Sequence, residues 1–322
     1  MKNIIEDFPK QFLFKPKIIN KEKLKKYDFY IVIGMGGSHL SADVLKTIKP
    51  ELPIIIHKNY GLPEIPNSIL KKSLVILSSY SGNTEEVIDA YLKAKNKKIS
   101  VFAISIGGKL LEMAKKDKIP YIQMPDLKIQ PRFALGLTIK SLLEVIGDRK
   151  LIIKSSNLSL ILNPKKLEKQ GKKIAEEIFG YVPIIYSSEK NMAIAYNWKI
   201  KFNENSKIPA FYNVFPELNH NEMTGFDIRE KTKNLSEKFY FLLLKDKNDN
   251  FRIIKRMEVL KKLFKKRNLK IKEINLSGEN DLEKVFSSLL LADWVSYYLS
   301  LKYNVENIEV PMVEEFKKLI KG

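Results

Sequence analysis

Two stretches near the start of the chain combine glycine with hydroxyl side chains in a pattern that suits anion binding. Residues 34–38 (GMGGS) and residues 78–85 (SSYSGNTE) each follow a short apolar run. Backbone amides at a helix N-terminus and neutral hydroxyl donors both bind phosphate, which carries about −1.5 to −2 charges near neutral pH. If the two runs are neighbouring parallel strands, their ends meet at one sheet edge, where such sheets bind ligands. The predicted phosphate-binding residues are Gly36, Gly37, Ser38, Ser79, Ser81 and Thr84.

Each stretch also has an ordinary interpretation when it is taken alone. The glycine stretch is equally typical of a tight turn between a strand and a helix. It does not match a dinucleotide-binding fingerprint, because His39 occupies the place of the third glycine, and the chain has no nucleotide P-loop sequence. Helix capping by Ser81 or Thr84 explains one hydroxyl group but not the cluster of hydroxyls.

Short apolar runs alternate with amphipathic, helix-length segments along the whole chain. In the first half, strands are expected at residues 29–33, 53–57, 74–78 and 100–104, and helices at 41–47, 85–96 and 134–145. In the second half, strands are expected at residues 182–186, 210–214, 239–244 and 270–276, and helices at 164–179, 191–203, 252–267, 280–303 and 313–321. This alternation predicts an α/β fold with a doubly wound parallel sheet in each of two domains, residues 1–150 and 151–322.

The composition of the chain excludes several classes of site. Its 322 residues include 57 Lys and Arg against 37 Asp and Glu, a formal net charge of +20, but only six of the 57 are Arg. Scattered Lys is typical of a solvated surface, so we expect no nucleic-acid partner. The chain has no Cys, which excludes disulfides and thiolate metal sites, and its three His leave little for another metal site. It begins without a signal-peptide pattern and has no membrane-length apolar run, which predicts a soluble, cytoplasmic protein with no membrane partner.

The two loops together resemble the phosphosugar-binding loops of sugar isomerase (SIS) domains. Further segments, in the same order along nearly the whole chain, are similar to the archaeal-type bifunctional phosphoglucose/phosphomannose isomerase family. These segments are residues 60–63 (YGLP), 130–132 (QPR), 203–207 (NENSK), 216–222 (PELNHNE), Asp293 with Ser296, and 313–317 (VEEFK). The resemblance implies two packed three-layer SIS domains, a C-terminal helix that contributes to the active site, and no metal or other cofactor. It also implies interconversion of fructose 6-phosphate with glucose 6-phosphate and mannose 6-phosphate.

The resemblance assigns roles to four residues in this reaction. Glu204 would be the base that moves a proton between C2 and C1, and His220 would open the sugar ring and relay a hydroxyl proton. Arg132 would stabilise the cis-enediolate, and Lys317 would act near the ring oxygen or O1. These residue types suit the tasks, since a carboxylate and an imidazole transfer protons and a guanidinium is always cationic. In the related isomerases the histidine acts in the neighbouring subunit's site, which implies a homodimer.

Two departures from the family pattern bear on this expectation. The bulky residues His39 and Leu40 follow Ser38 where relatives have small residues, and Val310 occupies a position where relatives have Thr or Gln. Val310 bears on the mannose 6-phosphate activity more than on the glucose 6-phosphate activity. Two alternatives remain open: a phosphosugar-binding SIS protein without catalytic activity, and an isomerase of another phosphosugar.

Overall fold

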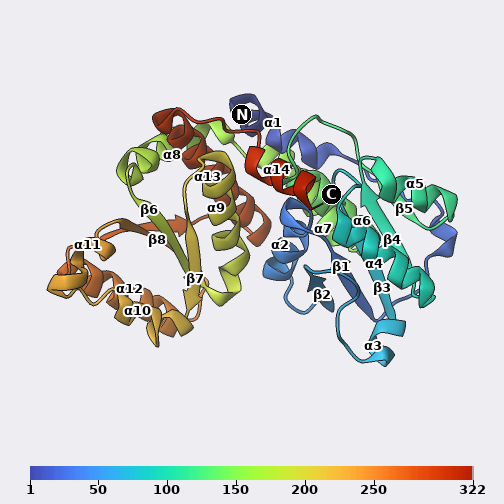
Figure 1. The fold of residues 1–322 in the computed structure, drawn as a ribbon, viewed down its shortest axis with the longest axis horizontal. Coiled ribbons are helices and arrows are strands. Elements are labelled where there is room, and N and C mark those ends of the chain that lie inside the picture. The colour runs from blue at the N-terminus through green and yellow to red at the C-terminus, as the bar shows by residue number, and fades with distance from the viewer. Residues whose placement is uncertain (321–322) are drawn as a thin grey trace. The chain divides into compact units, whose positions relative to one another are not determined.

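The computed structural model describes residues 1–320 and divides into two compact units. The N-terminal unit comprises Asp7–Ile161, and the C-terminal unit comprises Met1–Glu6 together with the chain from Leu162 onward. Each unit contains one parallel β-sheet with helices packed against it (Figure 1). The predicted α/β fold is therefore confirmed. No helix within residues 1–320 is long and apolar enough to cross a membrane.

The N-terminal unit has a five-stranded sheet in the order β2-β1-β3-β4-β5, with every neighbouring pair parallel. The strands are β1 (Phe29–Ile33), β2 (Ile54–His57), β3 (Ser73–Ser78), β4 (Val101–Ser105) and β5 (Tyr121–Gln123). The helices are α2 (Leu40–Ile48), α3 (Asn67–Lys71), α4 (Glu85–Asn96), α5 (Gly108–Lys116), α6 (Leu135–Ile146) and α7 (Arg149–Ile161). The chain runs from β1 to β2 and returns to β3 on the other side of β1. The C-terminal ends of β1 and β3 therefore form the switch point of this sheet, where ligands of α/β folds bind.

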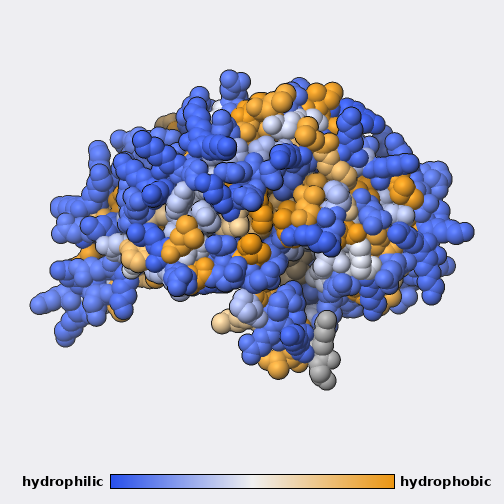
Figure 2. All heavy atoms as spheres, turned by 90° about the horizontal axis from the view of Figure 1, so that it is seen from above, coloured by the Kyte–Doolittle hydropathy of each residue, from blue (hydrophilic) through white to orange (hydrophobic). Residues whose placement is uncertain are grey.

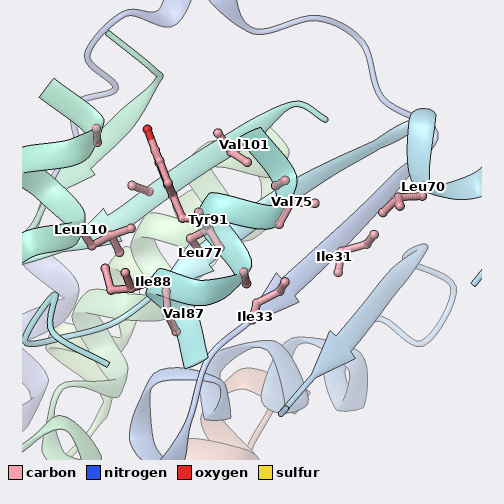
Figure 3. Packing of buried hydrophobic residues seen from close by; sticks show 14 residues of the cluster. Ile31, Ile33, Leu70, Val75, Leu77, Val87, Ile88, Tyr91, Val101 and Leu110 are labelled. Carbon is pink, nitrogen blue, oxygen red and sulfur yellow. The ribbon is translucent and has the colours of Figure 1, made fainter. Parts of the chain in front are cut away.

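Apolar side chains cover both faces of this sheet. On one face, Ile33 and Leu77 pack with Ile88 of α4 and Leu110 of α5 in a single buried cluster (Figure 3). Val32, whose side chain points to the opposite face because strand residues alternate, is also buried. Burying an aliphatic side chain of this size contributes about 1.5–3 kcal/mol. A sheet covered on both faces explains why its strands are continuous apolar runs in the sequence.

The C-terminal unit repeats this architecture with a four-stranded parallel sheet in the order β7-β6-β8-β9. The strands are β6 (Val182–Ser188), β7 (Phe211–Phe215), β8 (Phe239–Asp246) and β9 (Lys270–Leu276). The helices from this part of the chain are α8 (Pro164–Ile178), α9 (Met192–Asn205), α10 (Glu222–Gly225), α11 (Lys233–Ser236), α12 (Phe251–Lys266), α13 (Asp281–Tyr303) and α14 (Pro311–Leu319), while α1 (Lys2–Asp7) begins the chain. The switch point of this sheet lies between β6 and β8.

One face of the C-terminal sheet packs against α12. Tyr186 and Phe241 of the sheet form a buried cluster with Met257, Leu260 and Phe264, which recur at helical spacing along α12. The basic residues of α12 therefore lie on its other side, as expected for a core-facing helix. Hydrophilic side chains dominate the face of the molecule shown in Figure 2, in keeping with the scattered lysines of the sequence.

All the strands and helices that the sequence predicts are present, with small shifts at their ends. The strands at residues 29–33 and 270–276 and the helix at 85–96 have the predicted bounds. The elements that were not predicted are strand β5 and helices α1, α3, α5, α7, α10 and α11. The predicted C-terminal helix is α14, and residue 321 of that prediction lies outside the described residues.

Candidate functional site

The two predicted phosphate loops lie side by side at the switch point of the N-terminal sheet. The Ser78 hydroxyl donates to the backbone carbonyl of Ser38 at 2.8 Å, and the backbone amide of Tyr80 donates to Ser38 Oγ at 3.0 Å. Ser38 and Ser79 are buried in the segments that follow β1 and β3, which meet there as their positions in the sequence predict. The neighbouring strands therefore place hydroxyl groups from both loops at one edge.

The second loop is held by its own hydroxyl groups. Ser79 Oγ lies 2.8 Å from Thr84 Oγ1 and accepts a hydrogen bond from the Gly82 amide at 3.0 Å. Ser81 is exposed, and its Oγ accepts from the Asn83 amide at 3.2 Å. Thr84 is the N-cap residue of α4, but its side chain makes no capping hydrogen bond. Helix capping by Thr84 therefore does not account for this cluster.

Arg132 approaches the glycine loop from a short 3-10 helix, Pro131–Phe133. The approach is so close that a Cβ atom on Gly37 would lie 2.6 Å from the backbone nitrogen of Arg132. Arg132 is 2% exposed, and its Cζ lies 4.5 Å from the centre of the Phe133 ring. The N-terminal unit thus brings the backbone of Arg132 against Gly37, although the two residues lie far apart in the sequence.

Buried Gln11 supports the Arg132 segment and was not predicted as part of the site. Its Nε2 donates to the Phe133 carbonyl at 2.7 Å, and its Oε1 accepts from the Gly136 amide at 3.0 Å. These bonds fix the turn between Arg132 and helix α6. An isolated glutamine more than a hundred residues away gives no local sequence signal for such a contact.

His39 is a second unpredicted feature of this loop. It is 1% exposed, and its Nδ1 lies 2.5 Å from Asp43 Oδ2, one turn along α2. The bulky residue that departs from the family pattern is thus accommodated by a local pair with the aspartate that follows it. The glycine loop before it keeps its close contact with the β3 loop.

In the C-terminal unit, Glu204 lies in the last turn of α9 and is partly buried. The residues after it are tied to α13, because the Asn205 side chain donates to Ser296 Oγ and Ser206 Oγ donates to the Ser296 carbonyl, both at 2.9 Å. Lys207 Nζ donates to the Glu204 carbonyl at 2.5 Å and to the Glu309 carbonyl at 2.7 Å. The end of α9 therefore lies beside the segment that leads into α14.

Lys317 lies on α14, whose residues are all exposed in the chain. Its Nζ pairs with Glu314 Oε1, one turn earlier, at 2.7 Å. Val310 is the N-cap residue of this helix. The structure thus places the start of the lysine helix, rather than the lysine itself, next to the end of α9 that carries Glu204.

His220 lies at the other end of the same sheet from Glu204. It follows β7 and a short 3-10 helix, Glu217–Asn219, and is exposed. Because α9 precedes β7 in a parallel sheet, Glu204 lies near the beginning of β7 and His220 lies beyond its end. The five residues of β7 span about 17 Å. One chain therefore does not bring Glu204 and His220 of its C-terminal unit together.

The groups Glu217, His220 and Glu222 do not form a metal site. Within residues 1–320 there is no group of three or more His, Asp or Glu side chains that could hold a metal ion. The Glu222 carboxylate instead accepts hydrogen bonds from Tyr186 and Asn213, and Glu217 accepts one from the Asn221 side chain. The two carboxylates near His220 thus have separate partners.

Comparison with known proteins identifies the family of this chain. The bifunctional phosphoglucose/phosphomannose isomerase of Aquifex aeolicus is 33% identical over 99% of this chain and 97% of its own length. That of Caldicellulosiruptor bescii is 35% identical over 98% of this chain and 96% of its own length. The chain belongs to the bifunctional phosphoglucose/phosphomannose isomerase family. The resemblance noted in the sequence is thereby confirmed.

Two further matches concern the C-terminal unit and the fold. The family of bacterial phospho-glucose isomerase C-terminal SIS domains matches residues 167–320, which lie in the C-terminal unit. A crystal structure of a glucose-6-phosphate isomerase like protein from Thermus thermophilus has the same fold. It aligns with a TM-score of 0.62 at 13% identity, covering 98% of this chain and 94% of that protein.

Proposed function

We propose that this protein interconverts fructose 6-phosphate with glucose 6-phosphate, and also with mannose 6-phosphate. The reaction opens the sugar ring and then moves a proton between C2 and C1 through a cis-enediolate. Family membership over almost the whole chain carries this proposal. The convergence of Ser38, the Ser79 loop and Arg132 at one sheet edge supports it, because that edge offers donors to a phosphorylated sugar.

The phosphate group binds at the N-terminal switch point. Gly36 and Gly37 contribute backbone amides, and Ser38, Ser79, Ser81 and Thr84 contribute hydroxyl groups. The N-terminus of α4, which lacks a side-chain cap, adds amides and the positive end of the helix dipole. Neutral donors of this kind bind a dianion without needing a lysine in the loop.

The catalytic groups are Glu204, His220, Arg132 and Lys317. His220 donates a proton to the ring oxygen and takes up the proton that the anomeric hydroxyl loses, which opens the ring. Starting from glucose 6-phosphate, Glu204 then removes the C2 proton and returns it at C1, while the O2 hydroxyl proton passes to O1. Arg132 stabilises the negative charge that develops on the enediolate oxygens, an effect strengthened by its burial. Lys317 acts at the ring oxygen or the O1 hydroxyl.

We also propose that the protein is a homodimer with composite active sites. Glu204 and His220 of one chain lie beyond opposite ends of β7, so they do not act on one substrate from within their own unit. His220 is exposed, as a residue that reaches a neighbouring subunit must be. In this arrangement His220 of one protomer completes the site that contains Glu204 of the other.

The direct test is to incubate the purified protein with fructose 6-phosphate, with and without a chelator, and to resolve the products by NMR. Glucose 6-phosphate formed in the presence of chelator supports the proposed metal-independent isomerase. Mannose 6-phosphate beside it shows that Val310 tolerates the second epimer. No product from a folded protein that binds fructose 6-phosphate would contradict this reaction and favour a phosphosugar sensor or an isomerase of another phosphosugar.

Glu204→Gln separates catalysis from binding in the same assay. The amide keeps the size of the side chain but does not accept the C2 proton, so kcat is expected to fall by about a hundredfold or more. The dissociation constant for fructose 6-phosphate, measured by calorimetry, is expected to stay within a few-fold because the phosphate loop is intact. The exposed Glu230→Gln variant is the matched control and keeps its turnover. Retained turnover in Glu204→Gln would show that another group is the base.

A further inference from the structure

The loop that carries His220 is anchored to the sheet by a carboxylate two residues away. The Tyr186 hydroxyl donates to Glu222 Oε1 at 2.5 Å, and the Asn213 amide donates to Glu222 Oε2. Both oxygens of the carboxylate therefore have a donor. A hydrogen bond to an ionised acceptor is about twice as strong as a neutral one, so this pair is a firm attachment.

The two donors are neighbours in the sheet. Tyr186 on β6 and Asn213 on β7 are directly paired in the parallel register, so their side chains point to the same face. Asn213 is further fixed, because its Oδ1 accepts from the Val214 amide at 2.8 Å. The sheet thus presents a preformed pair of donors at a fixed spacing to one carboxylate.

Tyr186 remains a donor under any ordinary condition. It is fully buried and packs against Phe215 and Phe241, with ring centres 6.2 and 5.5 Å away. Burial, and secondarily the charge of Glu222, raises the pKa of Tyr186 well above its ordinary value. Its hydroxyl therefore stays protonated and bound to Glu222.

His220 lies between this attachment and a second one. Leu218, two residues before it, is fully buried in the cluster that contains Tyr186 and Phe215. The backbone amide of His220 donates to the Glu217 carbonyl at 2.9 Å, which closes a turn between the two anchors. An exposed imidazole is thus carried by a loop whose neighbouring residues are fixed on both sides.

We propose that Glu222 is a positioning residue for His220, acting through its bonds to Tyr186 and Asn213. The inference rests on the proposed ring-opening role of His220. A general acid must meet the ring oxygen at hydrogen-bond distance, and a misplacement of about 1 Å costs up to a hundredfold in rate. Fixing the loop in advance keeps the exposed imidazole in that position before the sugar arrives.

The test measures ring opening apart from proton transfer. In a Glu204→Gln background, which blocks the C2 transfer, ring opening and reclosure still exchange the α and β anomers of glucose 6-phosphate. NMR exchange spectroscopy measures this rate above the spontaneous one. Adding Glu222→Gln replaces one acceptor oxygen with an NH2 donor, so one of the Tyr186 and Asn213 donors loses its acceptor. The exchange rate is expected to fall by about tenfold to a hundredfold. Glu230→Gln, an exposed glutamate of the C-terminal unit outside the His220 loop, is expected to leave it unchanged.

A second readout distinguishes positioning from general destabilisation. An acyclic five-carbon aldonate 5-phosphate needs no ring opening, so its dissociation constant for the Glu222→Gln protein is expected to stay within a few-fold. Equal losses of anomer exchange and of aldonate binding would mean that Glu222 only supports the fold. Tyr186→Phe removes one of the two donors and is expected to lower anomer exchange to a smaller extent, which keeps the test decisive if Glu222→Gln does not fold.

Adding His220→Ala to the Glu204→Gln background distinguishes the ring-opening role of His220 from the positioning role of Glu222. If this variant keeps its anomer exchange, the ring-opening role of His220 is wrong and the inference on Glu222 falls with it. If His220→Ala loses the exchange while Glu222→Gln and Tyr186→Phe both keep it, the role of His220 stands and the positioning role of Glu222 is overturned.

Discussion

Side chains at the two switch points differ in charge. The N-terminal sheet ends in the neutral hydroxyls of Ser38 and Ser79, whereas the C-terminal sheet ends in a buried network around Asp246 and Asp249. Lys284 Nζ lies 2.6 Å from Asp246 Oδ2, and Ser188 Oγ donates to Asp249 Oδ1 at 2.7 Å. Two carboxylates and an internal counter-ion disfavour a phosphate at the second switch point. The difference in residue type explains why the phosphate site is proposed in one unit alone.

Asp249 gives this network a pH dependence that mutation can reveal. Burial raises the pKa of Asp249, against the opposing hydrogen bond from Ser188. A raised folded pKa means that the group stabilises the protein below its unfolded pKa of about 3.9 and that this contribution is lost as pH rises through the folded value. Asn does not titrate, so the stability of Asp249→Asn relative to the unmodified protein is expected to increase between pH 4 and pH 7. Urea unfolding at these pH values measures the difference.

Asp246→Asn is the matched comparison. Its stability relative to the unmodified protein is expected to change with pH in the opposite direction. Burial acts to raise the pKa of Asp246, but hydrogen bonds from Lys284, the Asn248 amide and Asn191 hold it below its ordinary value. The contribution of Asp246 is therefore present above about pH 3.9 and is lost as pH falls through the lower folded value. The deficit of Asp246→Asn is expected to shrink in acid. Two variants with the same pH slope would contradict this assignment.

At the scale of elements, the sequence predicts the helices and strands whose buried apolar residues recur at a regular spacing. Strand β5 has three residues and is held at the sheet edge by pairing with β4, so it has too few positions to show a pattern. Helix α7 buries only Ser155 and Leu158 along its 13 residues, which leaves no apolar stripe to recognise. These elements depend on tertiary contacts rather than on their own composition.

The same distinction applies to the site. The hydroxyl cluster is local in the sequence, and the structure brings its two loops together at the expected edge. The contact between Gly37 and Arg132, and the pairing of Tyr186 and Asn213 around Glu222, join residues from separate elements. Roles for Glu204, His220 and Lys317 came from family resemblance, because their residue types alone are equally typical of a solvated surface.

The packing of Gly37 against the Arg132 segment predicts the effect of adding one methyl group. A Cβ at Gly37 would lie 2.6 Å from both the Arg132 nitrogen and the Pro131 carbonyl carbon, so one of the two segments must move. Both segments carry proposed ligands of the substrate. Gly37→Ala is therefore expected to raise the KM for fructose 6-phosphate by about tenfold or more, measured with a coupled isomerase assay.

Gly107→Ala is the control for this change. Gly107 lies in the loop after β4, and a Cβ there would meet no atom within 4 Å. The Gly107→Ala protein is expected to have the same KM for fructose 6-phosphate and the same melting temperature as the unmodified protein. An unchanged KM in a folded Gly37→Ala protein would show that the close approach of the Arg132 segment is not needed for substrate binding.

At the scale of the whole molecule, the proposed roles of Glu204 and His220, which lie apart in one chain, call for two chains in each active site. In a closed symmetric dimer, each chain makes the same contacts with the other. If one chain supplies its histidine to the partner's site, the partner therefore supplies its own histidine in return. In the proposed homodimer, each chain contributes Glu204 to one site and His220 to the other. If one chain of a mixed dimer lacks Glu204 and the other lacks His220, one of the two sites still contains both residues.

Two variants that are each inactive can test whether one active site uses residues from two chains. Glu204→Gln and His220→Ala chains carrying different affinity tags are co-expressed, and the mixed dimer is isolated by sequential purification on both tags. One of its two sites combines Glu204 of the His220→Ala chain with His220 of the Glu204→Gln chain, so about half of the unmodified turnover per dimer is expected. A mixed dimer of Glu204→Gln/His220→Ala double-variant chains with Glu204→Gln chains has no intact site and serves as the control. If both residues act from one chain, the mixed dimer stays inactive, and if no species carries both tags, the homodimer itself is contradicted.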